Sequence, residues 1–171
     1  MISRAIRLSF ALAGESDAPA LAALRVATAR ALTERFGPGH WSGETTARGV
    51  IAGMRESKIW LARRGSSMVA TFRMSTTKPW AIDRSYFGRS AHPLYLTDMA
   101  VRADLHGQGI GRRCLVKAVS YAHAWPADAI RLDAYDAEAG AGAFYEKCGF
   151  REVGRVAYRG VPLVYYERMI Q

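Results

Sequence analysis

The sequence predicts an α/β (α+β) fold in a single domain, 1–171, with about seven strands and about four helices. Some segments show the two-residue alternation of half-buried strands, and others show helical periodicity. Their order along the chain is β-α-α-β-β-β-α-β-α-β-β. No linker, repeat or low-complexity stretch interrupts this order. A chain of 171 residues, of which 50% are hydrophobic, is long enough to bury a core without disulfides or metals.

The N-terminal half supplies a strand, two helices and a hairpin. Ser16 or Asp17 is expected to cap the first helix, with Pro19 in its first turn. The turn signal Arg64-Gly65-Ser66-Ser67 joins two strand-like segments, so an antiparallel hairpin is expected there. The expected elements are a strand over 6–12, helices over 17–36 and 45–56, and strands over 58–63 and 68–74.

The C-terminal half begins with a long, aromatic-bearing excursion over 78–93. A strand over 94–101, a helix over 110–124 and a strand over 129–135 are expected to follow it. After a short helical segment near 141–148, Arg159-Gly160 separates strands over 152–158 and 161–169, which predicts a second hairpin.

Three glycines, Gly107, Gly109 and Gly111, lie between the strand at 94–101 and the helix at 110–124. Free N–H groups at a helix start and the positive end of the helix dipole bind phosphate oxygens through the main chain. A dinucleotide fingerprint would require glycine where Arg112 stands, and the chain has no Gly-Lys-Ser or Gly-Lys-Thr of a P-loop. The run therefore predicts a phosphate-binding loop of another kind.

The pattern x-x-x-Gly-x-Gly after a strand ending Met99-Ala100-Val101 resembles the acetyl-CoA loop of the GNAT superfamily of acetyltransferases. A second motif follows in the same order as in that family. The segment Ala141-Gly-Ala-Phe-Tyr145-Glu-Lys-Cys-Gly149-Phe150 resembles the family's Ala-x-x-x-Tyr-x-x-x-Gly-Phe. The resemblance implies a central mixed, mostly antiparallel sheet that is splayed between its fourth and fifth strands.

The resemblance also implies acetyl-CoA as co-substrate and direct transfer of its acetyl group to an amine in a ternary complex. The sequence departs from the family where His106 replaces Gln or Arg, Ala103 a frequent Pro, and Glu138 a frequent Asn. By resemblance, pantetheine would pair with Met99, Ala100 and Val101, and the CoA phosphates would contact His106, Gly107, Gln108, Gly109, Ile110, Gly111 and Arg112.

Acetyl transfer from a thioester to an amine requires a neutral amine and a proton for the departing thiolate. Tyr145 matches the family's general-acid tyrosine, and a phenol with a pKa of about 10 is a suitable donor to a thiolate. Asp98 and Asp133 each lie in a strand expected to be buried or half-buried. Either carboxylate is a candidate base, directly or through water, and either is equally explained by pairing with Arg131, backbone donors or a tyrosine.

The composition and residue spacing argue against a metalloprotein and against a membrane-spanning protein. The four histidines lack metal-ligand spacing, so no metal is expected, and Cys114 and Cys148 are expected in the core. No apolar run reaches the roughly 18 residues of a membrane helix, so we expect a cytoplasmic protein without membrane contact.

The acceptor is left open by the sequence. An amine-bearing small molecule or peptide is expected, and the net charge of +9 keeps a nucleic-acid-associated acceptor as an alternative. A non-catalytic acyl-CoA-binding sensor or scaffold domain is a further alternative. An acceptor pocket or a homodimer interface would equally use the aromatic set Phe36, His40, Trp41, Trp80, Tyr86, Phe87, Tyr158, Tyr165 and Tyr166.

Overall fold

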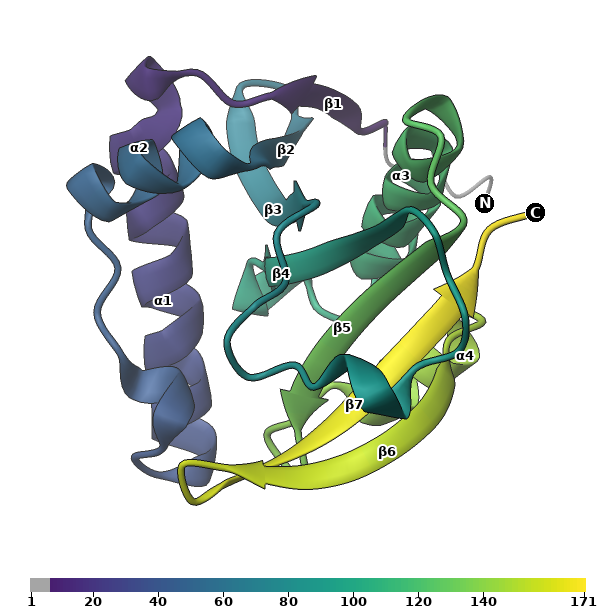
Figure 1. The fold of residues 1–171 in the computed structure, drawn as a ribbon. Coiled ribbons are helices and arrows are strands. Elements are labelled where there is room, and N and C mark those ends of the chain that lie inside the picture. The colour runs from purple at the N-terminus through teal and green to yellow at the C-terminus, as the bar shows by residue number, and fades with distance from the viewer. Residues whose placement is uncertain (1–6) are drawn as a thin grey trace, which may run out of the picture.

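The computed structural model describes residues 7–171, which form a twisted sheet with helices on both faces (Figure 1). The strands are β1 (Ser9–Leu12), β2 (Lys58–Arg64), β3 (Ser67–Ser75), β4 (Pro93–Val101), β5 (Ala129–Tyr135), β6 (Arg151–Tyr158) and β7 (Val161–Met169). The helices are α1 (Ala18–Phe36), α2 (Ala47–Glu56), α3 (Ile110–Ala124) and α4 (Gly142–Lys147), with short 3₁₀ helices η1 (Glu15–Asp17), η2 (His40–Ser42), η3 (Arg84–Tyr86) and η4 (Ala103–Leu105). In this described part the strands form one seven-stranded sheet in the order β1-β2-β3-β4-β5-β7-β6.

The expected helices and strands are all present in the described part of the chain, and the differences are at their boundaries. The first strand starts at Ser9, and Ile6, with which it was expected to begin, lies outside the described residues. Asp17 precedes α1 as expected, but its carboxylate accepts hydrogen bonds from the Gly14 N–H (2.9 Å) and from Arg63 (2.8 Å). Its side chain therefore ties the helix start to β2 instead of capping the helix's own N–H groups.

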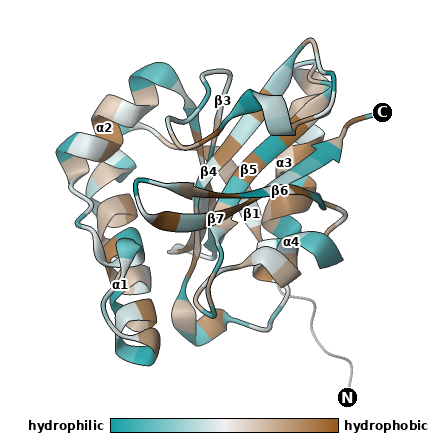
Figure 2. Ribbon diagram, turned by 60° about the horizontal axis from the view of Figure 1, so that its bottom comes forward, coloured by the Kyte–Doolittle hydropathy of each residue, from teal (hydrophilic) through white to brown (hydrophobic). Residues whose placement is uncertain are grey.

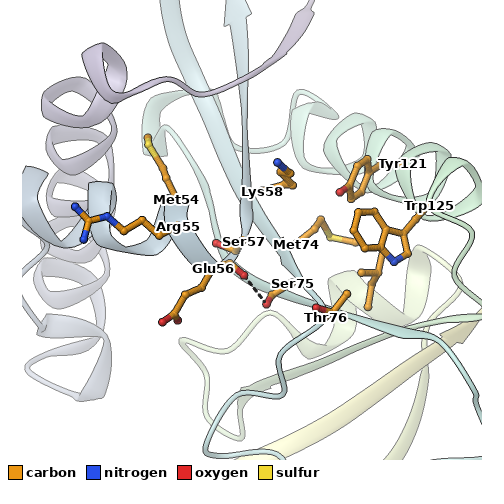
Figure 3. A pocket seen from close by; sticks show the side chains of 11 residues that line it. Met54, Arg55, Glu56, Ser57, Lys58, Met74, Ser75, Thr76, Tyr121 and Trp125 are labelled. Carbon is orange, nitrogen blue, oxygen red and sulfur yellow. Dashed lines mark hydrogen bonds between the residues drawn. The ribbon is translucent and has the colours of Figure 1, made fainter.

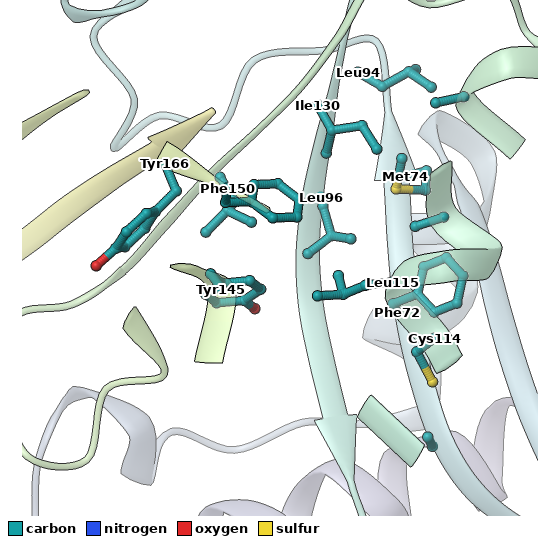
Figure 4. Close-up of a cluster of buried hydrophobic side chains, with 14 of the residues drawn as sticks. Phe72, Met74, Leu94, Leu96, Cys114, Leu115, Ile130, Tyr145, Phe150 and Tyr166 are labelled. Atoms are coloured by element: carbon teal, nitrogen blue, oxygen red, sulfur yellow. The ribbon is translucent and has the colours of Figure 1, made fainter. Parts of the chain in front are cut away.

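Helices α3 and α4 cover one face of the sheet, and α1 and α2 cover part of the other (Figure 1). Hydrophobic residues gather along the central strands (Figure 2). On the α3 face, Phe72 and Leu94 pack with Leu115, while Tyr145 and Phe150 join them from the α4 side (Figure 4). Burying a large apolar side chain contributes roughly 2 kcal/mol, so this cluster is the main source of stability.

The strands β4 and β5 form the parallel pair of the sheet, and they pair only over Pro93–Tyr95 and Ala129–Arg131. Beyond these residues they diverge toward α1, so the predicted splay between the fourth and fifth strands is confirmed (Figure 1). In the part of β4 that is not paired with β5, the pairing of β4 with β3 is also irregular, and Asp98 adopts a φ of 51°. A bulge of this kind bends β4, which favours its separation from β5.

The segment 76–92, which includes η3, crosses over β5 and β7 on the α1 face (Figure 1). A buried ion pair holds it there: Arg131 Nε donates to Glu167 Oε2 at 2.8 Å, and Arg131 Nη2 donates to the Gly88 carbonyl at 2.6 Å. The Gly88 N–H in turn donates to Glu167 Oε1 at 3.2 Å, and the Arg131 guanidinium lies over the Phe87 ring. The pair thus joins two strands to the covering segment.

Replacing Glu167 by Ala should lower the free energy of unfolding by about 3–5 kcal/mol, because it leaves the buried Arg131 charge without a partner. Urea denaturation measures this change. Glu152→Ala is the matched control, since it removes the exposed ion pair with Arg155 and should change stability little. Equal effects of the two substitutions would contradict the structural role assigned to the buried pair.

Candidate active site

The glycine run forms a cradle at the start of α3. Gly107 and Gly109 have φ values of 79° and 77°, in the left-handed region that favours glycine. Gly109 is the N-cap, and the first helical hydrogen bond runs from the Arg113 N–H to its carbonyl at 3.2 Å. The N–H groups of residues 110–112 therefore precede the helical hydrogen-bond ladder and face outward, as an anion site requires.

This cradle opens into a cavity of about 550 Å³ between α1, β4 and α4. The residues predicted to contact acetyl-CoA all line it except Gln108, which is exposed. Further lining comes from Thr28, Leu32, Leu105 and Ala139, which the motifs did not indicate, and from Ala141, Phe144, Lys147 and Cys148, which lie within the second motif. Neither Asp98 nor Asp133 is among the lining residues.

Two side chains fix the shape of this cavity. A side chain at Gly111 would meet the Phe144 ring at 3.0 Å, so glycine allows α3 and α4 to approach each other closely. The His106 ring is hydrogen-bonded to the Val101 carbonyl through Nε2 at 2.9 Å, which turns it back toward β4. His106 therefore offers its backbone, more than its ring, to a ligand in the cradle.

Tyr145 projects from α4 into the main core and reaches the cavity with its hydroxyl. It packs against Phe150 and Tyr166 (Figure 4), and its hydroxyl lies 3.9 Å from the Met99 sulfur. Burial raises the pKa of the Tyr145 phenol, and the negative charge of Asp133 raises it further. The phenol therefore holds its proton at neutral pH and acts as a hydrogen-bond donor.

Asp133 and Asp98 lie on the two sides of the splay, on β5 and β4. Asp133 is half-buried, and burial together with the charge of Asp98 raises its pKa. Within residues 7–171, no cationic side chain forms an ion pair with Asp133. Asp98, expected in a regular buried strand, instead occupies the bulge, and 42% of its side chain is exposed.

Asp98 is paired with two arginines that sequence patterns did not indicate. Its Oδ2 lies 3.8 Å from Arg25 Nη1 on α1 and 3.6 Å from Arg73 Nη1 on β3. A charged residue in phase with the buried face of a helix or strand is the signal that could have found them. Arg25 lies one helical turn after the buried Leu21, and Arg73 lies two residues after the buried Thr71, on the same face of β3.

The aromatic set does not form one surface. The expectation that Phe87, Tyr165 and Tyr166 face an acceptor or a partner is wrong, because all three are buried. Tyr165 packs under the segment 76–92 and accepts a hydrogen bond from the Asp83 N–H, whereas its neighbour Tyr166 lies in the α3-side core. Trp80 is 89% exposed, and Trp41 packs edge-on against Tyr135 with ring centroids 5.7 Å apart.

A second cavity, of about 190 Å³, lies between the ends of α2, β3 and α3. Figure 3 shows Glu56, Ser75, Tyr121 and Trp125 around it, with the Ser75 hydroxyl bonded to the Glu56 carbonyl. It has no glycine loop and contains none of the predicted site residues. Among residues 7–171 we find no group of three or more side chains suited to a metal, and no helix long and apolar enough to cross a bilayer.

The chain matches the model of the acetyltransferase (GNAT) family over residues 26–150. It is 30% identical over 142 residues to the uncharacterized N-acetyltransferase YesJ of Bacillus subtilis (strain 168), covering 81% of this chain and 78% of that protein. A GNAT-family acetyltransferase from Listeria monocytogenes 4b F2365 has the same fold, with a TM-score of 0.77, 16% identity and coverage of 99% and 98% of the two chains. PaiA N-acetyltransferase of Thermoplasma acidophilum, solved in complex with coenzyme A, also has this fold. Its TM-score is 0.71 at 12% identity, with coverage of 95% of this chain and 99% of that chain. The chain therefore belongs to the GNAT family of acetyltransferases.

Proposed function

We propose that the protein transfers the acetyl group of acetyl-CoA directly to the amine of a small acceptor, within a ternary complex. One observation carries this proposal: the cavity below the glycine cradle reaches the splay of β4 and β5, where a protonated phenol and a half-buried carboxylate lie on neighbouring elements. Asp133 does not line the cavity, but its charge acts on the Tyr145 phenol, so an acid and a base lie near each other, as amine acetylation requires.

The cavity suits CoA in shape and chemistry. The N–H groups at the start of α3 and the charge of Arg112 would hold the diphosphate, and the unpaired edge of β4 over Met99–Val101 would hold the pantetheine. Acetyl-CoA supplies the thioester whose acetyl group is moved. Within the protein, Tyr145 would give a proton to the departing thiolate, because its phenol is protonated and its hydroxyl faces the cavity beside Met99.

Asp133 is the better candidate for the base. Its raised pKa brings the carboxyl closer to the pH at which a general base works best, and no ion pair within residues 7–171 occupies it. Asp98 is already shared between Arg25 and Arg73, so we assign it the role of positioning these two side chains.

Direct transfer is favoured over an acetylated enzyme. Cys148 lines the cavity and is the thiol that could accept an acetyl group there. Burial raises the pKa of the Cys148 thiol, so little of the nucleophilic thiolate is present at neutral pH.

The proposal is tested by incubating the protein with acetyl-CoA and a panel of amines and measuring thiol release. Mass spectrometry of the gently purified protein should also detect bound CoA. Binding of acetyl-CoA without thiol release for any amine would instead support a non-catalytic acyl-CoA-binding domain. Acetylation restricted to RNA-bound or highly basic acceptors, with a steep loss of binding in salt, would support the nucleic-acid alternative.

Replacing Tyr145 by Phe should lower kcat by about 10²-fold, because the thiolate would leave without a proton donor, whereas KM for acetyl-CoA should change little. Steady-state thiol release measures both constants. Tyr158→Phe, on the last hairpin away from the cavity, is the control. A loss of twofold or less with unchanged folding would argue against an acid role for Tyr145.

Replacing Asp133 by Asn should remove the acid limb of the pH profile of kcat/KM. In the unmodified enzyme this constant should fall as the pH drops through the raised pKa of Asp133, because the protonated carboxyl cannot accept a proton. Asp136→Asn, at an exposed position just after β5, should keep the limb. An acid limb that is still present in the Asp133→Asn variant would contradict the role of Asp133 as the base.

The same substitution has a predicted effect on stability. Folding raises the pKa of Asp133, so its favourable contribution is complete below the unfolded pKa of about 4 and is lost as pH rises through the folded pKa. At pH 7, well above the unfolded pKa, folding must either bury a charged carboxylate at Asp133 or take up a proton there, and both lower the free energy of unfolding. Asp133→Asn should therefore be more stable than the unmodified protein at pH 7, and urea denaturation should show that this advantage shrinks toward pH 4.

A further inference from the structure

Two arginines share a single carboxylate beside the proposed site. Arg25 Nη1 and Arg73 Nη1 lie 3.8 and 3.6 Å from the same atom, Asp98 Oδ2. The Arg73 guanidinium is held in place because its Nε donates to the Ser57 hydroxyl at 2.6 Å, and that hydroxyl donates to the Gly53 carbonyl. Arg73 is thus held close to Arg25 by the carboxylate that both contact, although the two positive charges repel each other.

The charges in this cluster do not balance. Only 13% of the Arg25 side chain is exposed, and its Nε and Nη2 are buried with no hydrogen-bond partner among the described residues. Burial lowers the pKa of Arg25, and the neighbouring Arg73 lowers it further, while Asp98 acts in the opposite direction. A buried, poorly compensated guanidinium is costly and calls for an explanation. A second anion beside the pair would compensate the remaining positive charge.

The cluster lies next to the proposed cofactor cavity without lining it. On α1, Arg25 is one turn before Thr28, which lines the cofactor cavity, and Asp98 directly precedes Met99, which also lines it. Neither Arg25 nor Arg73 lines that cavity, so the anion they would bind is not a phosphate held in the cradle. Asp133, across the splay, is close enough for the charge of Asp98 to raise its pKa.

We propose that Arg25 and Arg73 bind a carboxylate of the acceptor, and that the acceptor is a small molecule with a free carboxylate beside its amine, as in an α-amino acid. This inference rests on the proposed function, because it names the acceptor class of that site. With such an acceptor, the two guanidinium groups would face two carboxylates. The amine would then face Asp133 on β5, across the splay from Asp98 on β4. Trp41 and Tyr135, packed edge to face near Asp133, form an aromatic surface for its side chain.

The inference is tested with matched acceptors that differ at the carboxylate: L-phenylalanine, L-phenylalaninamide and phenethylamine, and the corresponding leucine series. Thiol release from acetyl-CoA should give kcat/KM about tenfold or more higher for the acids than for the amides. The amide has the less basic amine, so its intrinsic reactivity favours the opposite order. Equal or better turnover of the amides and amines would overturn the inference while supporting acetyl transfer itself.

The variant Arg25→Gln should lower kcat/KM for the acids about tenfold or more and leave the amides within about threefold. Arg30→Gln, exposed on the same helix, is the matched control and should change neither. Arg25→Lys, which keeps the charge but loses the planar fork, should give an intermediate preference and guards against a folding defect in Arg25→Gln. A loss of the same size for acids, amides and amines would assign Arg25 a structural role and overturn the inference.

Binding provides a second readout that does not depend on turnover. In the presence of CoA, the acids should raise the melting temperature of the unmodified protein and fail to raise that of Arg25→Gln. This pattern without thiol release would reject the proposed acetyl transfer and keep the carboxylate site. Absence of both thiol release and a melting shift with the acids would reject the carboxylate site as well.

Discussion

The separation of β4 from β5 is the constraint on which the rest of the structure depends. The two strands pair only over Pro93–Tyr95 and Ala129–Arg131, and the unpaired edge of β4 beyond them faces the cavity. A sheet interrupted in this way needs support on both sides. The main core and α3 hold β4, while the Arg131–Glu167 ion pair and the segment 76–92 hold β5 against β7. In the proposed reaction, both substrates would meet at the opening that this support maintains.

Most of the fold could be predicted from local sequence patterns. Helical and strand periodicity depends on neighbours a few residues apart, so the order of elements follows from the sequence, as does the glycine cradle before α3. The start of β1 at Ser9 does not, because among the described residues this strand is defined by the pairing of Ser9–Leu12 with β2. The bulge of β4 at Asp98 could not be predicted from a local pattern either. A regular alternating strand and a bulged strand can have the same residue pattern.

The proposed acceptor side could not be predicted because it is assembled from distant segments. Arg25, Arg73 and Asp98 come from α1, β3 and β4, and their meeting depends on how α1 crosses the sheet. The aromatic residues show the same difficulty: Tyr165 and Tyr166 are consecutive, yet they enter different clusters on opposite faces. Composition shows that aromatic side chains are present, but the segment 76–92 decides that Tyr165 is covered.

The proposed acceptor side also concentrates features that do not favour folding. Asp133 is a half-buried carboxylate whose pKa burial raises, Arg25 has buried donors without partners among the described residues, and Asp98 holds a left-handed backbone conformation that is uncommon outside glycine. Each is unfavourable by itself, and the apolar clusters on both faces supply the stability that offsets them. An acceptor that brings an amine to Asp133 and a carboxylate to the arginine pair would relieve two of these three costs on binding. Such relief would couple acceptor binding to the removal of local costs that the free protein carries at this cluster.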